Sequence, residues 1–182
     1  MKIYTHDDLV ELARRWLITR GCNVVITEMA SNAGQEPDAI GWLGSGYSIL
    51  IECKTSRADF FSDRNKGCNR ADYSMGAYRF YLAPHGMIDV SDLPGGWGLL
   101  APRGRRVAKQ AESNYFENYK EDRELNILLS AMRRLKFKDQ PGIRVRQYQI
   151  IGKSANRATV GIRAEEGIAE IEKSSKRGGD LE

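Results

Sequence analysis

The first forty residues combine a helical pattern with a β-branched run. Thr5 and, three residues later, Asp8 are typical of a helix N-terminus, and apolar residues then recur at helical spacing at Leu9, Leu12, Ala13, Trp16 and Leu17. Gly21 predicts the end of this helix. The β-branched run from Val24 to Met29 predicts a strand, which the turn-forming residues 31–34 end.

The next elements alternate between strands and helices. The runs DAIGWL (38–43) and YSILIECK (47–54) are joined by a short glycine-containing loop, which predicts a β-hairpin. The later elements expected are a short helix within 55–68, strands at 77–83, 97–101 and 105–109, a long amphipathic helix over roughly 122–138 stopped by Pro141-Gly142, and a final strand at 143–151. This order predicts an α/β fold with a mixed central sheet flanked by helices.

Length and composition narrow the class of protein. The 182 residues suffice for one domain with its own core, and we expect that domain over 1–160, followed by a polar, flexible tail at 161–182 that has hardly any large apolar residues. No apolar run approaches the ~20 residues of a membrane helix, so we expect no membrane partner. Three cysteines without a CxxC pair and the absence of an apolar leader favour a cytoplasmic location.

The predicted hairpin brings acidic residues together. If its loop is centred on Ser45, opposed residues have numbers that sum to 90, so Asp38 faces Glu52, and the side-chain period of two adds Lys54 to the same face. Opposed carboxylates repel, and hard divalent cations such as Mg2+ are the usual occupants of such oxygen clusters. The alternative is a hairpin end with a solvated Asp, Glu and Lys. The chain has only two histidines, His6 and His85, so catalysis is expected to rely on carboxylates and lysine.

These residues also form a motif. Asp38 follows Pro37 directly, and Glu52-Cys53-Lys54 ends the apolar strand, so the chain reads PD, thirteen residues, then ExK. With this order of elements the chain resembles the PD-(D/E)xK nuclease superfamily, which has the restriction-endonuclease-like fold. The segments ECKTSRADFFSDRNK, YRFYLAP and LPGGWGLL are similar to the branch of MmcB-type DNA-repair nucleases. The resemblance covers about residues 5–101.

The resemblance implies a metal-dependent nuclease that hydrolyses phosphodiester bonds, with DNA favoured, in repair, recombination or phage DNA metabolism. It implies Mg2+ or Mn2+ as the cofactor. It makes Asp38 and Glu52 the metal ligands, with the Cys53 backbone carbonyl as a further candidate. Lys54 then orients or activates the attacking water. A homodimer is left open.

The superfamily often adds an upstream acid, for which two residues compete. Glu28 lies near a strand end and is favoured over Glu11, which lies opposite the apolar stripe of its helix. An ordinary exposed acid remains the alternative for Glu28. The pattern after ExK adds three supporting residues, which are Asp59, Asp63 and Lys66.

Positive charge is concentrated after residue 100. Residues 101–160 hold 14 Lys+Arg against 6 Asp+Glu, whereas residues 1–100 hold 10 against 12. A cluster around one turn, Arg103, Arg105, Arg106 and Lys109, favours contact with nucleic-acid phosphates. The helix at 122–138 begins with acids (Glu117, Glu121, Asp122 and Glu124) and ends with cations, a pattern that complements a helix dipole. The alternative to a nuclease is a catalytically silent nucleic-acid- or protein-binding module on the same fold.

Overall fold

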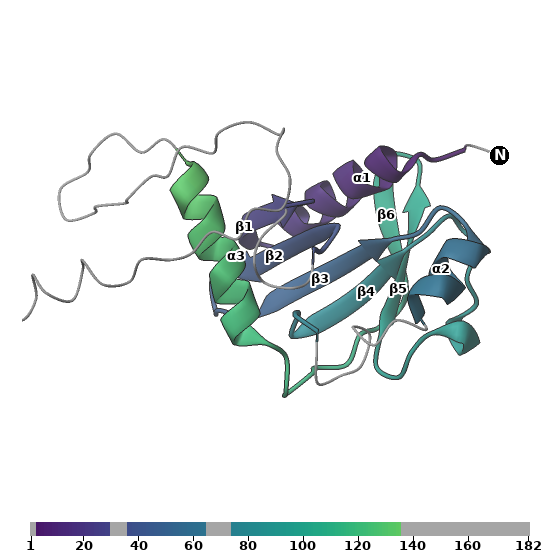
Figure 1. Ribbon diagram of the computed structural model, residues 1–182. Coiled ribbons are helices and arrows are strands. Elements are labelled where there is room, and N and C mark those ends of the chain that lie inside the picture. Colours follow the sequence, from purple (N-terminus) through teal and green to yellow (C-terminus); the bar gives the residue numbers. More distant parts are fainter. Residues whose placement is uncertain (1–2, 30–35, 65–73, 136–182) are drawn as a thin grey trace, which may run out of the picture. The chain divides into compact units, whose positions relative to one another are not determined.

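The computed structural model describes residues 3–29, 36–64 and 74–135, all within one compact unit of the chain, Met1–Gln147. These residues form a six-stranded mixed sheet with α-helices, so the predicted α/β class is confirmed (Figure 1). No helix in this part of the chain is long and apolar enough to cross a membrane. The predicted strand at 143–151 and the predicted tail at 161–182 lie outside the described residues.

The strands follow one another across the sheet in chain order. Neighbours are antiparallel from β1 to β3, parallel from β3 to β5, and antiparallel between β5 and β6. Helix α2 (Arg57–Arg64) lies in the crossover that the parallel β3–β4 pair requires. The strand bounds are β1 Cys22–Thr27, β2 Ala39–Leu43, β3 Ser48–Cys53, β4 Tyr78–Leu82, β5 Gly98–Arg103 and β6 Arg106–Ala111.

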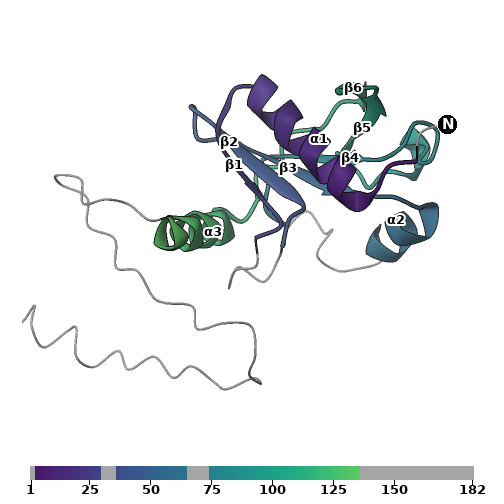
Figure 2. The same cartoon turned by 90° about the horizontal axis from the view of Figure 1, so that it is seen from above.

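Helices cover both faces of the sheet. Helix α1 (His6–Thr19) packs on one face, whereas α2 and α3 (Glu121–Arg134) contribute to the core on the other (Figure 2). Side chains of β3 alternate between the two cores, since Ile51 joins the cluster under α1 while Leu50 joins the opposite cluster. Burial on both faces explains why β3 reads as a continuous apolar run.

The two long helices differ in how well their bounds were predicted. In α1, Thr5 Oγ1 accepts a hydrogen bond from Asp8 N–H at 3.1 Å and Asp8 Oδ2 accepts one from Thr5 N–H at 3.0 Å, which confirms the predicted N-terminus. Gly21, with φ 89°, follows its end as predicted. Helix α3 ends at Arg134, before the predicted residue 138, because Leu135 already has extended backbone angles.

The register of the β2–β3 hairpin is the predicted one. The paired residues are Ala39–Ile51, Ile40–Leu50, Gly41–Ile49 and Trp42–Ser48, and Leu43 N–H donates to Tyr47 O at 2.9 Å. Every pair has numbers that sum to 90. The ladder begins at Ala39, so Asp38 lies one residue before it.

Candidate active site

Asp38 connects the start of β2 to the end of β3. Its Oδ2 accepts a hydrogen bond of 2.6 Å from the N–H of Cys53. The half-buried carboxylate of Asp38 therefore contacts the backbone of β3 next to Glu52, where a backbone donor stabilises its charge. Burial raises the pKa of Asp38, and the Cys53 N–H offsets part of that rise.

Glu28 approaches the same point from the end of β1. Its φ of 46° is a left-handed backbone conformation that residues with a side chain rarely adopt, and its N–H donates to Asp38 O at 3.2 Å. Glu28 Oε1 lies 3.2 Å from His6 Nε2, and Asp38 Oδ1 lies 3.5 Å from the same nitrogen. One oxygen from each of two carboxylates thus faces a single ring nitrogen.

His6 is the residue that the sequence reasoning missed. Helix α1 has 14 residues and β1 has six, so at 1.5 Å per helical residue and 3.3 Å per strand residue both are about 20 Å long. The strand runs back along the helix after the turn at Gly21. Because the two have equal length, the end of β1 lies beside the start of α1. The N-cap at Thr5 fixes His6 as the first helical residue, so this comparison of lengths could have placed His6 beside Glu28.

Lys54 forms a buried ion pair with α2. Its Nζ lies 3.1 Å from Asp63 Oδ2, and both side chains are largely buried. Burial alone would lower the pKa of Lys54, but the charges of Glu52 and Asp63 outweigh it, so the pKa is raised. Lys54 is therefore an ammonium at neutral pH. It can orient water or offset phosphate charge, but it holds its proton too tightly to act as a general base.

The other predicted site residues take different places. Glu52 is half-buried and acts on Lys54 through its charge. Cys53 is buried, and burial raises the pKa of its thiol well above the ordinary value, so only its backbone carbonyl suits a hard cation. Asp59 is exposed in the first turn of α2, and its charge also raises the pKa of Lys54. Lys66 lies outside the described residues.

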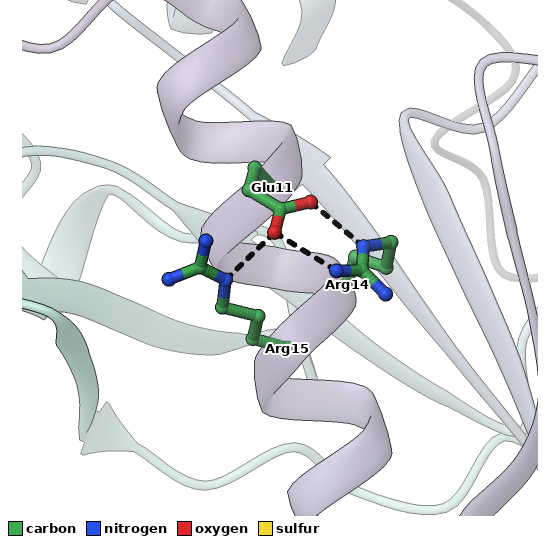
Figure 3. A network of polar contacts seen from close by, with 3 residues as sticks. All are labelled: Glu11, Arg14 and Arg15. Atoms are coloured by element: carbon green, nitrogen blue, oxygen red, sulfur yellow. Dashed lines mark hydrogen bonds and ion pairs between the residues drawn. The ribbon is translucent and has the colours of Figure 1, made fainter.

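Glu11, the competing upstream acid, is held by two arginines of its own helix (Figure 3). Its oxygens lie 2.7 Å and 2.9 Å from Nε and Nη2 of Arg14 and 2.6 Å from Nε of Arg15. These hydrogen bonds, first from Arg14 and then from Arg15, lower the pKa of Glu11 to about 2. Glu11 thus takes part in a surface network and Glu28 is the acid at the sheet edge.

The residue types at this edge suit a hard divalent cation. Asp38 and Glu28 aim one oxygen each at a common point, and Glu52 and the Cys53 carbonyl follow from the adjacent strand end. Across 3–29, 36–64 and 74–135, however, no group of three or more His, Cys, Asp or Glu side chains is arranged to hold a metal ion. In the arrangement described, the His6 ring takes the position between the two carboxylates.

The basic turn joins β5 to β6. Arg103 and Arg106 are paired across it, and Arg105 lies within it beside Gly104, whose φ of 63° suits a tight turn. All three arginines are exposed. Lys109 differs from them, since its Nζ lies 2.5 Å from Glu112 Oε1.

Comparison with models of protein families and with curated proteins finds no match for the chain. Among solved structures, the chain is similar to a protein from Silicibacter pomeroyi described as SPO1766 protein of unknown function. The identity is 23% and the TM-score 0.56, and the match covers 74% of this chain and 90% of that chain. At this identity the similarity bears on the fold alone.

Proposed function

We propose that the protein is a metal-dependent nuclease that hydrolyses phosphodiester bonds in DNA. The observation that carries the proposal is the 2.6 Å hydrogen bond from Cys53 N–H to Asp38 Oδ2. This bond holds Asp38, the acid of the PD pair, against β3, the strand that ends in the ExK residues. A site formed by both parts of the motif requires this proximity. The Lys54 ammonium, held by Asp63, belongs to the same strand end.

Each residue has a role in this proposal. Asp38 and Glu52, with Glu28 as the upstream acid, would hold Mg2+ or Mn2+, with the Cys53 carbonyl as a further ligand. The metal supplies charge neutralisation at the phosphate and an acidified water. Lys54 orients the attacking water and offsets charge that develops on the phosphate. His6, beside both carboxylates, keeps them together while no cation is bound.

A catalytically silent nucleic-acid-binding module is the second candidate. The observation that favours it is the placement of His6, since its Nε2 lies 3.2 Å from Glu28 Oε1 and 3.5 Å from Asp38 Oδ1, where a cation would otherwise contact both carboxylates. The two candidates predict different responses to divalent cations.

Labelled single-stranded, duplex and branched DNA, and matching RNA, would be incubated with the protein in Mg2+, Mn2+ or EDTA. A nuclease cleaves at least one substrate with Mg2+ or Mn2+ and none with EDTA, and Glu52→Gln removes the cleavage. Glu11→Gln serves as the control, because it changes an acid of the same chain that contacts only arginines among the interactions described. Binding without cleavage in every metal would favour the silent module.

A further inference from the structure

The last two turns of α1 and the start of β6 enclose a basic hollow. Its volume is about 420 Å³. The helix contributes positions spaced by three and four residues, which form one stripe along its surface. The lining residues are Leu12, Arg15, Trp16, Thr19, Arg20, Arg105, Arg106 and Val107.

Four arginines contribute to this hollow, and most of their charge is uncompensated. Arg15 has a carboxylate partner in Glu11 at 2.6 Å. Arg20, Arg105 and Arg106 form no ion pair with any residue that the structure describes. Like charges at close range repel, so three guanidinium groups around one hollow create a strong preference for an anion.

Trp16 determines which anion fits. It is only 7% exposed, its ring packs edge-on against Phe80 with centroids 5.4 Å apart, and Arg20 Cζ lies 4.9 Å from its centroid. A base therefore has no aromatic face on which to stack, and Trp16 instead orients the Arg20 guanidinium. Beside Leu12, Val107 and the Thr19 hydroxyl, the charged groups of the hollow are guanidinium forks, which suit phosphate oxygens.

We propose that this hollow binds a backbone phosphate of the nucleic acid, away from the phosphate that is cleaved. The inference rests on the proposed function for the identity of the partner. Trp16 is ten residues after His6 on the same helix, which is about 15 Å at 1.5 Å per residue. Since a duplex strand advances about 3.4 Å per nucleotide, a strand that follows α1 places this phosphate about four nucleotides from the cleaved bond.

The test is the salt dependence of binding, measured by fluorescence anisotropy with a labelled duplex in EDTA so that no cleavage occurs. Each lost phosphate contact flattens the slope of log affinity against log salt by about 0.9, so Arg20→Ala/Arg105→Ala/Arg106→Ala, which removes the one contact proposed for the hollow, should flatten it by about 0.9. Arg105→Ala/Arg106→Ala, which leaves the packing on Trp16 intact, should flatten it in the same direction by no more than about 0.9. Arg14→Ala, an arginine of the same helix outside the hollow, should leave it unchanged.

An unchanged slope in the double variant would overturn the proposal, as would arginine-dependent binding to anionic lipid vesicles without binding to the duplex. A slope that flattens as predicted supports it even if no metal produces cleavage, in which case the nuclease proposal alone fails. Duplexes with fewer than about four nucleotides on either side of the cleaved bond should bind the wild type and the triple variant equally. A difference between them on these short duplexes would overturn the placement along α1.

Discussion

Each end of the β2–β3 hairpin has a carboxylate beside it. The two carboxylates differ in the number of hydrogen bonds that they accept. At the end where β2 finishes and β3 begins, Glu124 of α3 is only 4% exposed. It accepts hydrogen bonds from Trp42 Nε1 at 2.9 Å, Ser48 Oγ at 2.7 Å and Gly76 N–H at 2.7 Å. At the other end, Asp38 accepts one backbone hydrogen bond and directs its second oxygen at a histidine.

This difference separates a structural carboxylate from one available to a ligand. Burial raises the pKa of Glu124, and its three donors offset part of that rise, so α3 is tied to the sheet by a fully satisfied group. Asp38 lies beside the carboxylate of Glu28, a residue whose backbone is strained. Strained backbone and polar groups with few hydrogen bonds cluster at functional sites. The number of hydrogen bonds that a buried acid accepts therefore distinguishes a structural carboxylate from one that is available to a ligand.

The largest expected effect is on catalysis at the Asp38 end. Asp38→Asn should lower metal-dependent cleavage by about 1,000-fold, equivalent to about 4 kcal/mol, because it removes ligand charge. The asparagine oxygen can still accept from Cys53 N–H, so the urea midpoint should stay near the wild-type value. Single-turnover rates and urea unfolding test both statements. Cleavage by this variant at the wild-type rate would contradict the comparison.

At the Glu124 end the effect should fall on stability instead. Glu124→Ala leaves three donors without their acceptor, at a cost of about 1 kcal/mol or more each, so the free energy of unfolding should drop by about 3 kcal/mol. Urea denaturation measures the loss, and cleavage per folded molecule should not change. Asp122→Ala, an exposed acid of the same helix turn, is the matched control and should cost less than about 1 kcal/mol.

Substitution of Lys54 should have a smaller effect on cleavage, and it should change turnover much more than affinity. Lys54→Ala should lower turnover by about 100-fold and change the dissociation constant less than about threefold, since its charge acts on the reacting phosphate and is one of many in binding. Filter binding and single-turnover kinetics measure the two quantities. Equal losses in both would make Lys54 a binding residue.

The smallest effect is the pH dependence of stability. The pKa of Glu124 is raised above its unfolded value of 4.5, so the folded state holds the proton more tightly. The free energy of unfolding should therefore fall as pH rises from 4.5 through the folded pKa, by at most about 1.4 kcal/mol per pH unit. Asp38, also raised from 3.8, contributes with the same sign. Urea denaturation across pH should show a shallower fall in Glu124→Gln, and an equal fall would contradict this assignment.

The predictable parts of the molecule are those set by local chemistry. The hairpin register follows from one loop and an apolar strand, so the pairing sum of 90 held for every ladder pair. The capping box of α1 likewise depends on two residues that are three positions apart, Thr5 and Asp8. In the same way, the mixed sheet follows from the order of elements.

The remaining features depend on contacts between distant residues. Glu124 lies in the first turn of α3 with the other acids, as the helix-dipole pattern predicts, but its hydrogen bonds to partners 48 to 82 residues away could not be predicted from that pattern. The end of α3 at Arg134 was missed because no glycine or proline marks it in the sequence, whereas Pro141-Gly142 follows later. His6 has no motif and is identified only when helix and strand lengths are compared.

Position 28 is where a design that optimises stability alone would choose glycine. A left-handed backbone costs a residue with a side chain about 1–2 kcal/mol relative to glycine, and Glu28 adopts that backbone beside Asp38. Consensus-style stabilisation of the fold would therefore select against the carboxylate that the proposed chemistry uses. The sequence keeps a stability deficit at this edge, and a thermostable variant of the protein would have to recover it elsewhere.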